Sequence, residues 1–463
     1  MQNDFINKIS KQFGDGSFSF LEAMKLSPFV SIRKNPSKST AQWNNEEKVP
    51  WCAEGYYLPE KPIYTLDPLF HAGCYYPQEA SSMFIDWILR QLKTNTQNPV
   101  ILDLCAAPGG KSTLISTFLN GKGLLIANEI IKNRSHILLE NMTKWGNKNC
   151  IITQNSPADF HSLRNFFDII LVDAPCSGEG MFRKDKRAIE EWSENNAAMC
   201  AVRQQKILTD IWHSLKPDGF LIYCTCTFNP SENEENIALF AKEKQAEILP
   251  LTPPDTWGIT SINISNGNGL AFYPHLTKGE GFFVAVLKKM NDKKLDSVDI
   301  NKKNNSLFNT KYNNIFKPKS IIHLFPKIEI SSILKSIDDM NFYEEKNIIR
   351  AFPKQFSEEF ITIKNRLNVI EYGLRIGETS QKGFIPEHSL AMSSDFCNQR
   401  YPELELEIDE ALKYLKGETL RTSGFEKGYL LLKYKGISLG FGKEIGTRIN
   451  NLYPLNWRIR MQV

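Results

Sequence analysis

The stretch 221–236, LIYCTCTFNPSENEEN, marks the point where a buried strand gives way to a polar helix. Its apolar beginning predicts a strand, which breaks out into polar residues before Cys226. Asn229 and Pro230 predict a turn, and Ser231 with Glu234 three residues later predicts a capping box at the start of a helix. Open α/β sheets bind their ligands at the carboxyl ends of the strands. Cys226 is therefore expected to lie at a ligand-binding edge.

Strands and helices alternate on the N-terminal side of this stretch. Apolar runs predict buried strands at 100–104, 124–128, 150–153, 167–173 and 220–224. The segments between them carry helical patterns, and a late apolar run at 281–287 completes the series. This alternation predicts an α/β fold with a parallel, doubly wound, Rossmann-like sheet.

The whole chain is expected to divide into five parts. Residues 1–70 predict a small α+β N-terminal domain, and 71–290 hold the Rossmann-like core. Residues 291–319 are rich in Asn and Lys and predict a linker, and 320–385 predict a small accessory domain. The part 386–463 is β-rich, and its short strands with frequent Gly and Lys predict a small β-barrel.

Basic and aromatic side chains interleave in the N-terminal part. The basic residues and aromatics in question are Lys25, Arg33, Lys34, Lys38, Trp43, Trp51, Tyr56, Tyr57 and Tyr64. Such a pattern can neutralise and stack single-stranded RNA. Packing of the aromatics in a core is the alternative interpretation.

Composition limits the cellular setting. The sequence lacks a run of about 18 apolar residues, so no membrane span is expected. The N-terminus lacks the apolar region of a signal peptide. Nine cysteines without framework spacing favour a reducing, cytoplasmic location. The absence of a CxxC pair and of a His-rich cluster predicts that no metal is bound.

Positive charge is concentrated at the C-terminal end. Residues 411–463 contain ten Lys and Arg against three Asp and Glu, an excess of seven positive charges. The net charge of the whole chain is only +4, so the remainder is slightly acidic. A compact basic end on a near-neutral protein favours a polyanionic partner.

The loop CAAPGGKS at 105–112 follows the first core strand and opens a helix. A phosphate-binding P-loop needs Gly at the first position of its motif, and Cys105 stands there instead. That substitution disfavours an NTPase. Asp173, at the end of a buried strand, could nevertheless be the Walker B acid of such an enzyme. The other interpretation is a cradle for S-adenosylmethionine, because small residues let a ligand approach backbone N–H groups. Glu129, at the end of the next strand, would then suit the ribose.

A second thiol is expected at the same edge as Cys226. Asp173 ends a buried strand, and Cys176 follows three residues later. Buried cysteines often act as small hydrophobic residues, which is the interpretation adopted for Cys74, Cys150, Cys200 and Cys397. We also expect Cys224 to serve mainly in packing, whereas Cys176 and Cys226 are expected to face a cofactor.

Three separated stretches together resemble the Nol1/Nop2/Sun family of RNA cytosine-C5 methyltransferases. They are DLCAAPGGKST at 103–113, DAPCSGEGMFRKD at 173–185 and YCTCTFNPSENE at 223–234. The C-terminal stretches SLA at 389–391 and GYLLLKYKG at 428–436 resemble the PUA-like tail of the bacterial branch that modifies small-subunit ribosomal RNA. The resemblance thus implies a methyltransferase core followed by a β-rich PUA-like domain.

This resemblance implies roles for individual residues. S-adenosylmethionine would be bound by Cys105, Ala106, Ala107, Pro108, Gly109, Gly110, Lys111, Glu129, Ser156 and Asp173. Asp173 would also face the base, Cys226 would be the nucleophile, and Cys176 would help to release the product. The chain departs from the family at Ser156, where many members carry an acid that contacts the adenine, and Asn155 or Asp159 could substitute for it.

The resemblance also implies a chemistry and leaves alternatives open. Addition of a cysteine thiolate to C6 of cytosine would activate C5 for methylation in small-subunit (16S) rRNA, by a monomeric enzyme. DNA cytosine-C5 enzymes use a Pro-Cys thiol, so Pro175 and Cys176 permit the opposite assignment of the nucleophile. A tRNA target and an inactive ribosome assembly factor are the alternative functions.

Overall fold

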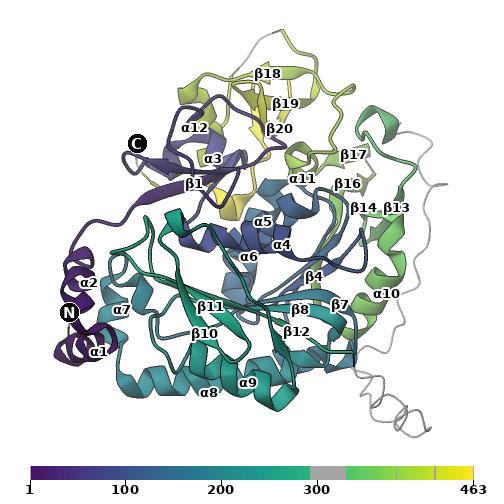
Figure 1. The fold of residues 1–463 in the computed structure, drawn as a ribbon. Helices are drawn as coiled ribbons and strands as arrows, with labels where there is room; N and C mark the ends of the chain where they lie inside the picture. Colours follow the sequence, from purple (N-terminus) through teal and green to yellow (C-terminus); the bar gives the residue numbers. More distant parts are fainter. Residues whose placement is uncertain (1, 292–329, 382, 422–423, 462–463) are drawn as a thin grey trace, which may run out of the picture.

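The computed structural model describes residues 2–291, 330–381, 383–421 and 424–461. Apart from its first residue, the predicted linker 291–319 lies outside this described part. The predicted division of the chain into five domains stays a prediction. The described residues form a central ten-stranded sheet with smaller sheets above it and beside it (Figure 1).

The central sheet has the strand order β10-β11-β12-β8-β7-β4-β5-β6-β15. Its parallel middle consists of β8 (Leu215–Thr225), β7 (Phe167–Asp173), β4 (Val100–Asp103), β5 (Leu124–Asn128) and β6 (Cys150–Thr153). The antiparallel edge strands are β10 (Thr260–Ile264), β11 (Gly267–Phe272), β12 (Phe282–Lys288) and β15 (Val369–Tyr372), while the short β9 (Glu247–Ile248) pairs with β12. The doubly wound sheet is thus confirmed.

The prediction of an entirely parallel sheet is wrong at both edges. The apolar run 281–287 falls almost entirely within β12, which runs antiparallel to β8 because the chain returns through the β10–β11 hairpin. At the other edge, β15 pairs antiparallel with β6. Residues assigned to an accessory domain therefore extend the central sheet.

Helices cover both faces of the sheet (Figure 1). One face carries α4 (Ile85–Gln91), α5 (Gly110–Leu119) and α6 (Lys132–Trp145). The other carries α8 (Glu194–Trp212), α9 (Glu234–Lys244) and α10 (Ser357–Arg366). Side chains of a strand alternate between faces, so Leu102 of β4 packs in one core and the adjacent Ile101 in the other. Burial on both faces holds the strand ends in a fixed row.

The N-terminal part contributes two helices and a small sheet. α1 (Asn3–Phe13) and α2 (Ser17–Ala23) pack against the core, and α7 (Lys186–Glu191) lies near them (Figure 1). The sheet consists of β1 (Val30–Lys34), β2 (Gly55–Leu58) and β3 (Tyr75–Pro77), with the short α3 (Pro68–His71) before β3. Phe5 of α1 packs on the rings of Phe182 and Trp192, which places α1 beside the loop after β7.

Most of the interleaved basic and aromatic side chains described for this part are buried rather than exposed to solvent. Trp51, Tyr56 and Tyr57 are buried, so the alternative of core packing is confirmed for them. Arg33 is only 1% exposed, and its guanidinium lies 4.5 Å above the ring of Trp145. A role in stacking RNA is therefore wrong for these side chains.

Two four-stranded sheets complete the fold. One consists of β13 (Met340–Glu345), β14 (Ile348–Pro353), β16 (Leu374–Ser380) and β17 (Gly383–Pro386). The other consists of β18 (Glu403–Glu405), β19 (Gly428–Tyr434), β20 (Ile437–Glu444) and β21 (Ile449–Asn451), accompanied by α11 (His388–Met392) and α12 (Ile408–Lys416). The β-rich character predicted for this part is confirmed, but among the described residues no pairing of β18 with β21 closes the predicted small β-barrel.

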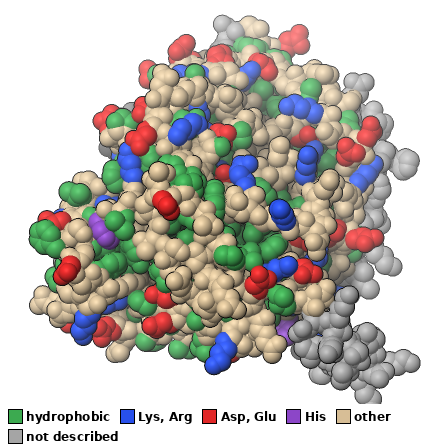
Figure 2. Space-filling view, in the orientation of Figure 1, with side chains coloured by type: hydrophobic (Ala, Val, Ile, Leu, Met, Phe, Trp, Pro, Cys, Tyr) green, Lys and Arg blue, Asp and Glu red, His purple; other side chains and the backbone are tan. Residues whose placement is uncertain are grey.

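The chain's first and last sheets share one hydrophobic core. Ile32 and Tyr56 of the N-terminal sheet pack in the same cluster as Leu430 and Tyr453 of the C-terminal part. On the face seen in Figure 2, hydrophobic side chains gather in the middle, and basic side chains are interspersed with acidic ones. Within the described ranges, we find no helix with the length and apolar character that crossing a membrane requires.

Candidate active site

The predicted site residues follow neighbouring strands at one edge of the sheet. Cys226 follows β8, Asp173 ends β7, the loop 105–111 follows β4, Glu129 follows β5 and Ser156 comes after β6. These strands are consecutive and mutually parallel in the sheet, so their carboxyl ends form a row. The structure therefore brings the predicted residues to one edge, as ligand binding in open α/β sheets requires.

The thiols of Cys176 and Cys226 meet at this edge. Their Sγ atoms lie 3.2 Å apart, and both cysteines are free and half-buried. The hydrogen bond to Cys226 and burial together hold the pKa of Cys176 well above its usual range. Cys176 therefore stays a thiol that can donate to Cys226.

The remaining cysteines divide as expected, with two exceptions. Cys397, which was assigned to packing as a buried residue, is half-buried, and Cys224 contacts the site. Cys74, Cys150 and Cys200 are buried, which agrees with packing roles. Cys224 is also buried, but its thiol lies 3.5 Å from Oδ1 of Asp173. Cys224 thus contacts the site in addition to its packing in β8.

Asp173 and Lys111 form an ion pair between the end of β7 and the cofactor loop. The Nζ of Lys111 donates to Oδ2 of Asp173 at 2.7 Å, and the Asp173 side chain is 34% exposed. Burial lowers the pKa of Lys111, but the carboxylate of Asp173 outweighs burial and the net effect is a rise. Lys111 is therefore a permanent cation that orients Asp173, while Asp173 remains accessible to a ligand.

The loop 105–111 offers backbone rather than bulky side chains. Gly109 has a φ of 115°, a left-handed conformation that favours glycine, and α5 begins at Gly110. Arg134 and Asn141 of α6 brace the loop by donating to the carbonyls of Ala107 and Pro108, both at 2.8 Å. A helix N-terminus behind small residues fits an anionic group such as the carboxylate of S-adenosylmethionine.

Glu129 is buried beside this loop. Its Oε1 accepts from the amide of Ile131 at 2.9 Å, and its Oε2 lies 3.4 Å from Arg134. The side chain is 3% exposed. A carboxylate fixed at the end of the second strand suits the hydroxyls of a ribose.

Asp103 was missed by the sequence prediction. It ends β4 beneath the loop, is fully buried, and accepts from the hydroxyl of Ser112 at 2.6 Å. Its Oδ1 is buried and has no hydrogen-bond partner among the described residues. Burial raises its pKa to about 7. An unpaired buried acceptor beside the loop fits a ligand that brings a hydrogen-bond donor, such as the amino group of S-adenosylmethionine. One sign of this role was present in the sequence, because Asp103 stands at the carboxyl end of a predicted strand.

Ser156 is engaged within its own turn. Its amide and hydroxyl both donate to Oδ2 of Asp159 at 2.8 Å. Asn155 is tied to Asn368, whose amide donates to Oδ1 of Asn155 at 3.0 Å. Contact of any of these side chains with an adenine stays a prediction.

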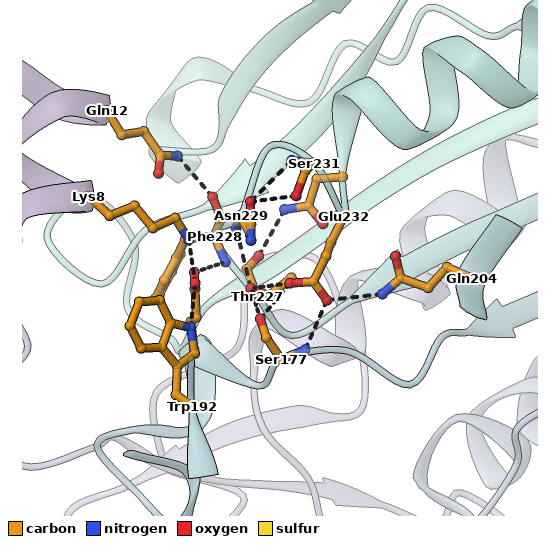
Figure 3. Close-up of polar contacts among 12 residues, drawn as sticks. Lys8, Gln12, Ser177, Trp192, Gln204, Thr227, Phe228, Asn229, Ser231 and Glu232 are labelled. Atoms are coloured by element: carbon orange, nitrogen blue, oxygen red, sulfur yellow. Dashed lines mark hydrogen bonds and ion pairs between the residues drawn. The ribbon is translucent and has the colours of Figure 1, made fainter. Parts of the chain in front are cut away.

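Two buried glutamates that the sequence prediction also missed frame the thiols. Glu179 and Glu232 are both fully buried, and each accepts hydrogen bonds from the loop that carries the other. Figure 3 shows Glu232 reaching Ser177 and Gln204. The predicted capping box is wrong, since α9 begins only at Glu234 and Ser231 instead donates to Asn229 at 3.0 Å. The intervening turn frees Glu232 to point inward at Ser177.

Family models cover most of the chain. The N-terminal domain of 16S rRNA methyltransferase RsmF matches residues 1–80, and 16S rRNA methyltransferase RsmB/F matches 90–288. The methyltransferase RsmF PUA domain matches 401–459. The chain is 32% identical to ribosomal RNA small subunit methyltransferase F of Psychromonas ingrahamii, over 92% of this chain and 88% of that protein. It is 30% identical to the protein of the same name from Aliivibrio fischeri, over 94% of this chain and 92% of that protein.

Solved structures share the fold. A methyltransferase homolog from Pyrococcus horikoshii is 28% identical with a TM-score of 0.53, covering 63% of this chain and 96% of that chain. NSun6 from the same organism, solved with SFG, is 22% identical with a TM-score of 0.53. The match covers 63% of this chain and 99% of that chain. The row of strand ends is where an open α/β sheet binds its ligand, and it agrees with the matches to methyltransferases over about nine tenths of this chain. The chain belongs to the 16S rRNA methyltransferase RsmB/F family, whose cofactor is S-adenosylmethionine.

Proposed function

We propose that this protein methylates carbon 5 of a cytidine in small-subunit (16S) ribosomal RNA, through a covalent adduct between Cys226 and C6 of the base. The observation that supports this most strongly is the pair of thiols 3.2 Å apart beside Asp173. One thiol alone at a strand end would be compatible with packing. Two thiols and an accessible acid supply the groups that pyrimidine-C5 chemistry requires.

Cys226 acts as the nucleophile in this proposal. Its thiolate forms the Sγ–C6 bond, and the electron pair of the C5–C6 double bond makes C5 nucleophilic. Asp173 holds the proton at N3 that stabilises the adduct, and Lys111 orients its carboxylate at 2.7 Å. The target base must be extruded or single-stranded, because C6 is shielded in a stacked helix.

Cys176 acts after the new bond has formed. With a raised pKa it is a neutral thiol at the start. It passes its proton to the sulfur of Cys226, 3.2 Å away, as that atom leaves C6, and its own sulfur accepts the proton lost from C5 while the C5–C6 double bond re-forms. S-adenosylmethionine, when bound, supplies an electrophilic methyl group on its sulfonium. The proposed binding residues are the loop 105–111, Glu129, Ser156 and Asp173, with Asp103 beneath the loop.

The ribosomal target rests on the relatives and on the C-terminal part. Proteins similar over about nine tenths of this chain are named for the small ribosomal subunit. The excess of seven positive charges in 411–463 suits a polyanion. The proposal also takes the protein to act as a monomer in the cytoplasm. A tRNA target and an assembly factor without activity are the alternatives.

Radiolabel transfer from S-adenosylmethionine separates these functions. Purified protein is incubated with small ribosomal subunits, naked 16S rRNA and bulk tRNA. The proposal predicts label on ribosomal RNA as 5-methylcytidine, and bisulfite sequencing locates the modified cytidine. Label on tRNA alone would overturn the ribosomal target, and no label on any substrate would favour the assembly factor.

A further inference from the structure

The loops that carry the two thiols are joined by reciprocal carboxylate contacts. Glu179, three residues after Cys176, accepts from the amide of Phe228 at 3.1 Å. Glu232, six residues after Cys226, accepts from the amide of Ser177 at 2.9 Å. The amide of Gly180 also donates to the carbonyl of Cys226 at 2.8 Å. Each loop thus fixes the backbone of the other immediately beside a thiol.

Glu179 needs a partner because it is fully buried. Its Oε1 accepts from Nε1 of Trp192 at 2.9 Å and forms an ion pair with Lys8. Lys8 belongs to α1, and its side chain is 16% exposed. An ionised carboxylate without a countercharge is costly in a protein interior. Lys8 is the cation that the structure places against Glu179.

α1 reaches the second loop as well. Gln12, one helical turn after Lys8, donates to the carbonyl of Phe228 at 2.9 Å. Figure 3 shows Lys8 and Gln12 extending from the same side toward the segment 227–229. Phe228 is therefore held through its amide by Glu179 and through its carbonyl by Gln12.

We propose that Lys8 and Gln12 are positioning residues for the thiol pair, and that α1 completes the catalytic centre from the N-terminal part of the chain. Lys8 holds the carboxylate of Glu179 in place through their ion pair, and Glu179 and Gln12 fix Phe228. The backbone two residues after Cys226 is thereby fixed. The inference rests on the proposed thiol chemistry. A displacement of reacting atoms by about 1 Å can lower a rate by two orders of magnitude.

The test compares Lys8→Met with Lys11→Met in the full chain. Lys11 is exposed on the same helix and provides the matched control. The first readout uses no RNA: diamide takes two electrons and two protons from Cys176 and Cys226, and the rate of disulfide formation reports how well the thiols are aligned. The second readout is kcat and KM for RNA methylation.

We expect Lys8→Met to slow disulfide formation and to lower kcat about tenfold, with KM for RNA and for S-adenosylmethionine unchanged. Lys8→Arg should restore both values, since it keeps the cation, and Lys11→Met should match the wild type. Gln12→Met removes only one hydrogen bond and should show a smaller loss in both readouts. It replaces Lys8→Met as the test variant if Lys8→Met does not fold.

Two results would overturn the inference. One is an unchanged kcat and disulfide rate in both Lys8→Met and Gln12→Met. The other is a rise in KM for RNA with an unchanged disulfide rate, which would make α1 an RNA contact instead. Failure of the proposed chemistry is distinguishable, because it would appear as methylation that survives Cys226→Ala, whereas the disulfide readout does not depend on RNA.

Discussion

Ser177 donates both its amide and its hydroxyl to Glu232, at 2.9 and 2.5 Å, although 55 residues separate them. Glu232 also accepts from Nε2 of Gln204 at 3.1 Å. This carboxylate therefore links the loop after β7, the segment before α9 and the middle of α8. Burial raises the pKa of Glu232, and its donors counteract that rise.

Removing this carboxylate should destabilise the fold. Glu232→Ala leaves the buried amide of Ser177 without its acceptor and removes one acceptor from Gln204, and we expect the free energy of unfolding to fall by about 2–3 kcal/mol. Glu235→Ala, on the exposed face of α9, is the control and should have little effect. Urea denaturation measures both variants. Equal stability of the two would show that Glu232 does not hold the loops together.

Glu129→Gln should weaken cofactor binding without disturbing the fold. The glutamine oxygen can still accept from the amide of Ile131, but the charge opposite Arg134 is lost. Loss of a charge-assisted hydrogen bond to a ribose corresponds to about tenfold in Kd. Calorimetric titration with S-adenosylmethionine measures the change, with the exposed Glu243→Gln as control. An unchanged Kd would remove Glu129 from the binding site.

Asp103 should make stability depend on pH. Burial raises its folded-state pKa from the ordinary value of 3.8 to about 7. The folded state therefore binds more protons than the unfolded state between pH 4 and 7, and stability falls as pH rises through that window.

Asp103→Asn should remove this contribution while it keeps an acceptor for Ser112. Its stability relative to wild type should rise between pH 4 and 8 by up to about 4 kcal/mol, at about 1.4 kcal/mol per pKa unit. Urea denaturation at both pH values tests this. A difference that does not vary with pH would contradict the burial of an ionisable Asp103.

A buried ion pair connects the loop after β7 with the segment before β12. Nε of Arg183 lies 2.8 Å from Glu280, and the two side chains are 1% and 3% exposed. Removing either partner leaves a buried charge, so Arg183→Met and Glu280→Met should each cost about 3–5 kcal/mol. The double variant should lose much less than their sum. Additive losses in a double-mutant cycle would argue against direct coupling.

The sequence was sufficient to predict the strand ends and the residues on them. Strands buried on both faces read as apolar runs, so the positions of Asp173, Cys176 and Cys226 at one edge followed from strand order alone. The antiparallel edges could not be predicted in this way, because an apolar run such as 282–288 does not specify its direction.

Long-range partners also escaped prediction. Lys8 and Glu179 are 171 residues apart, and only the folded chain shows that α1 supplies the countercharge. Glu179 and Glu232 lie inside stretches that carry the family resemblance, but acids in polar loops are ordinarily solvated. Their burial depends on the packing of two loops that the sequence places 50 residues apart.

The central claim is that Cys226 attacks the base. The most direct measurement is covalent trapping on 16S rRNA that contains 5-fluorocytidine, in the presence of S-adenosylmethionine, because fluorine at C5 prevents release of the adduct. We predict that wild type and Cys176→Ala form a stable protein–RNA adduct and that Cys226→Ala forms none. An adduct that persists in Cys226→Ala and disappears in Cys176→Ala would contradict the account and exchange the roles of the two thiols.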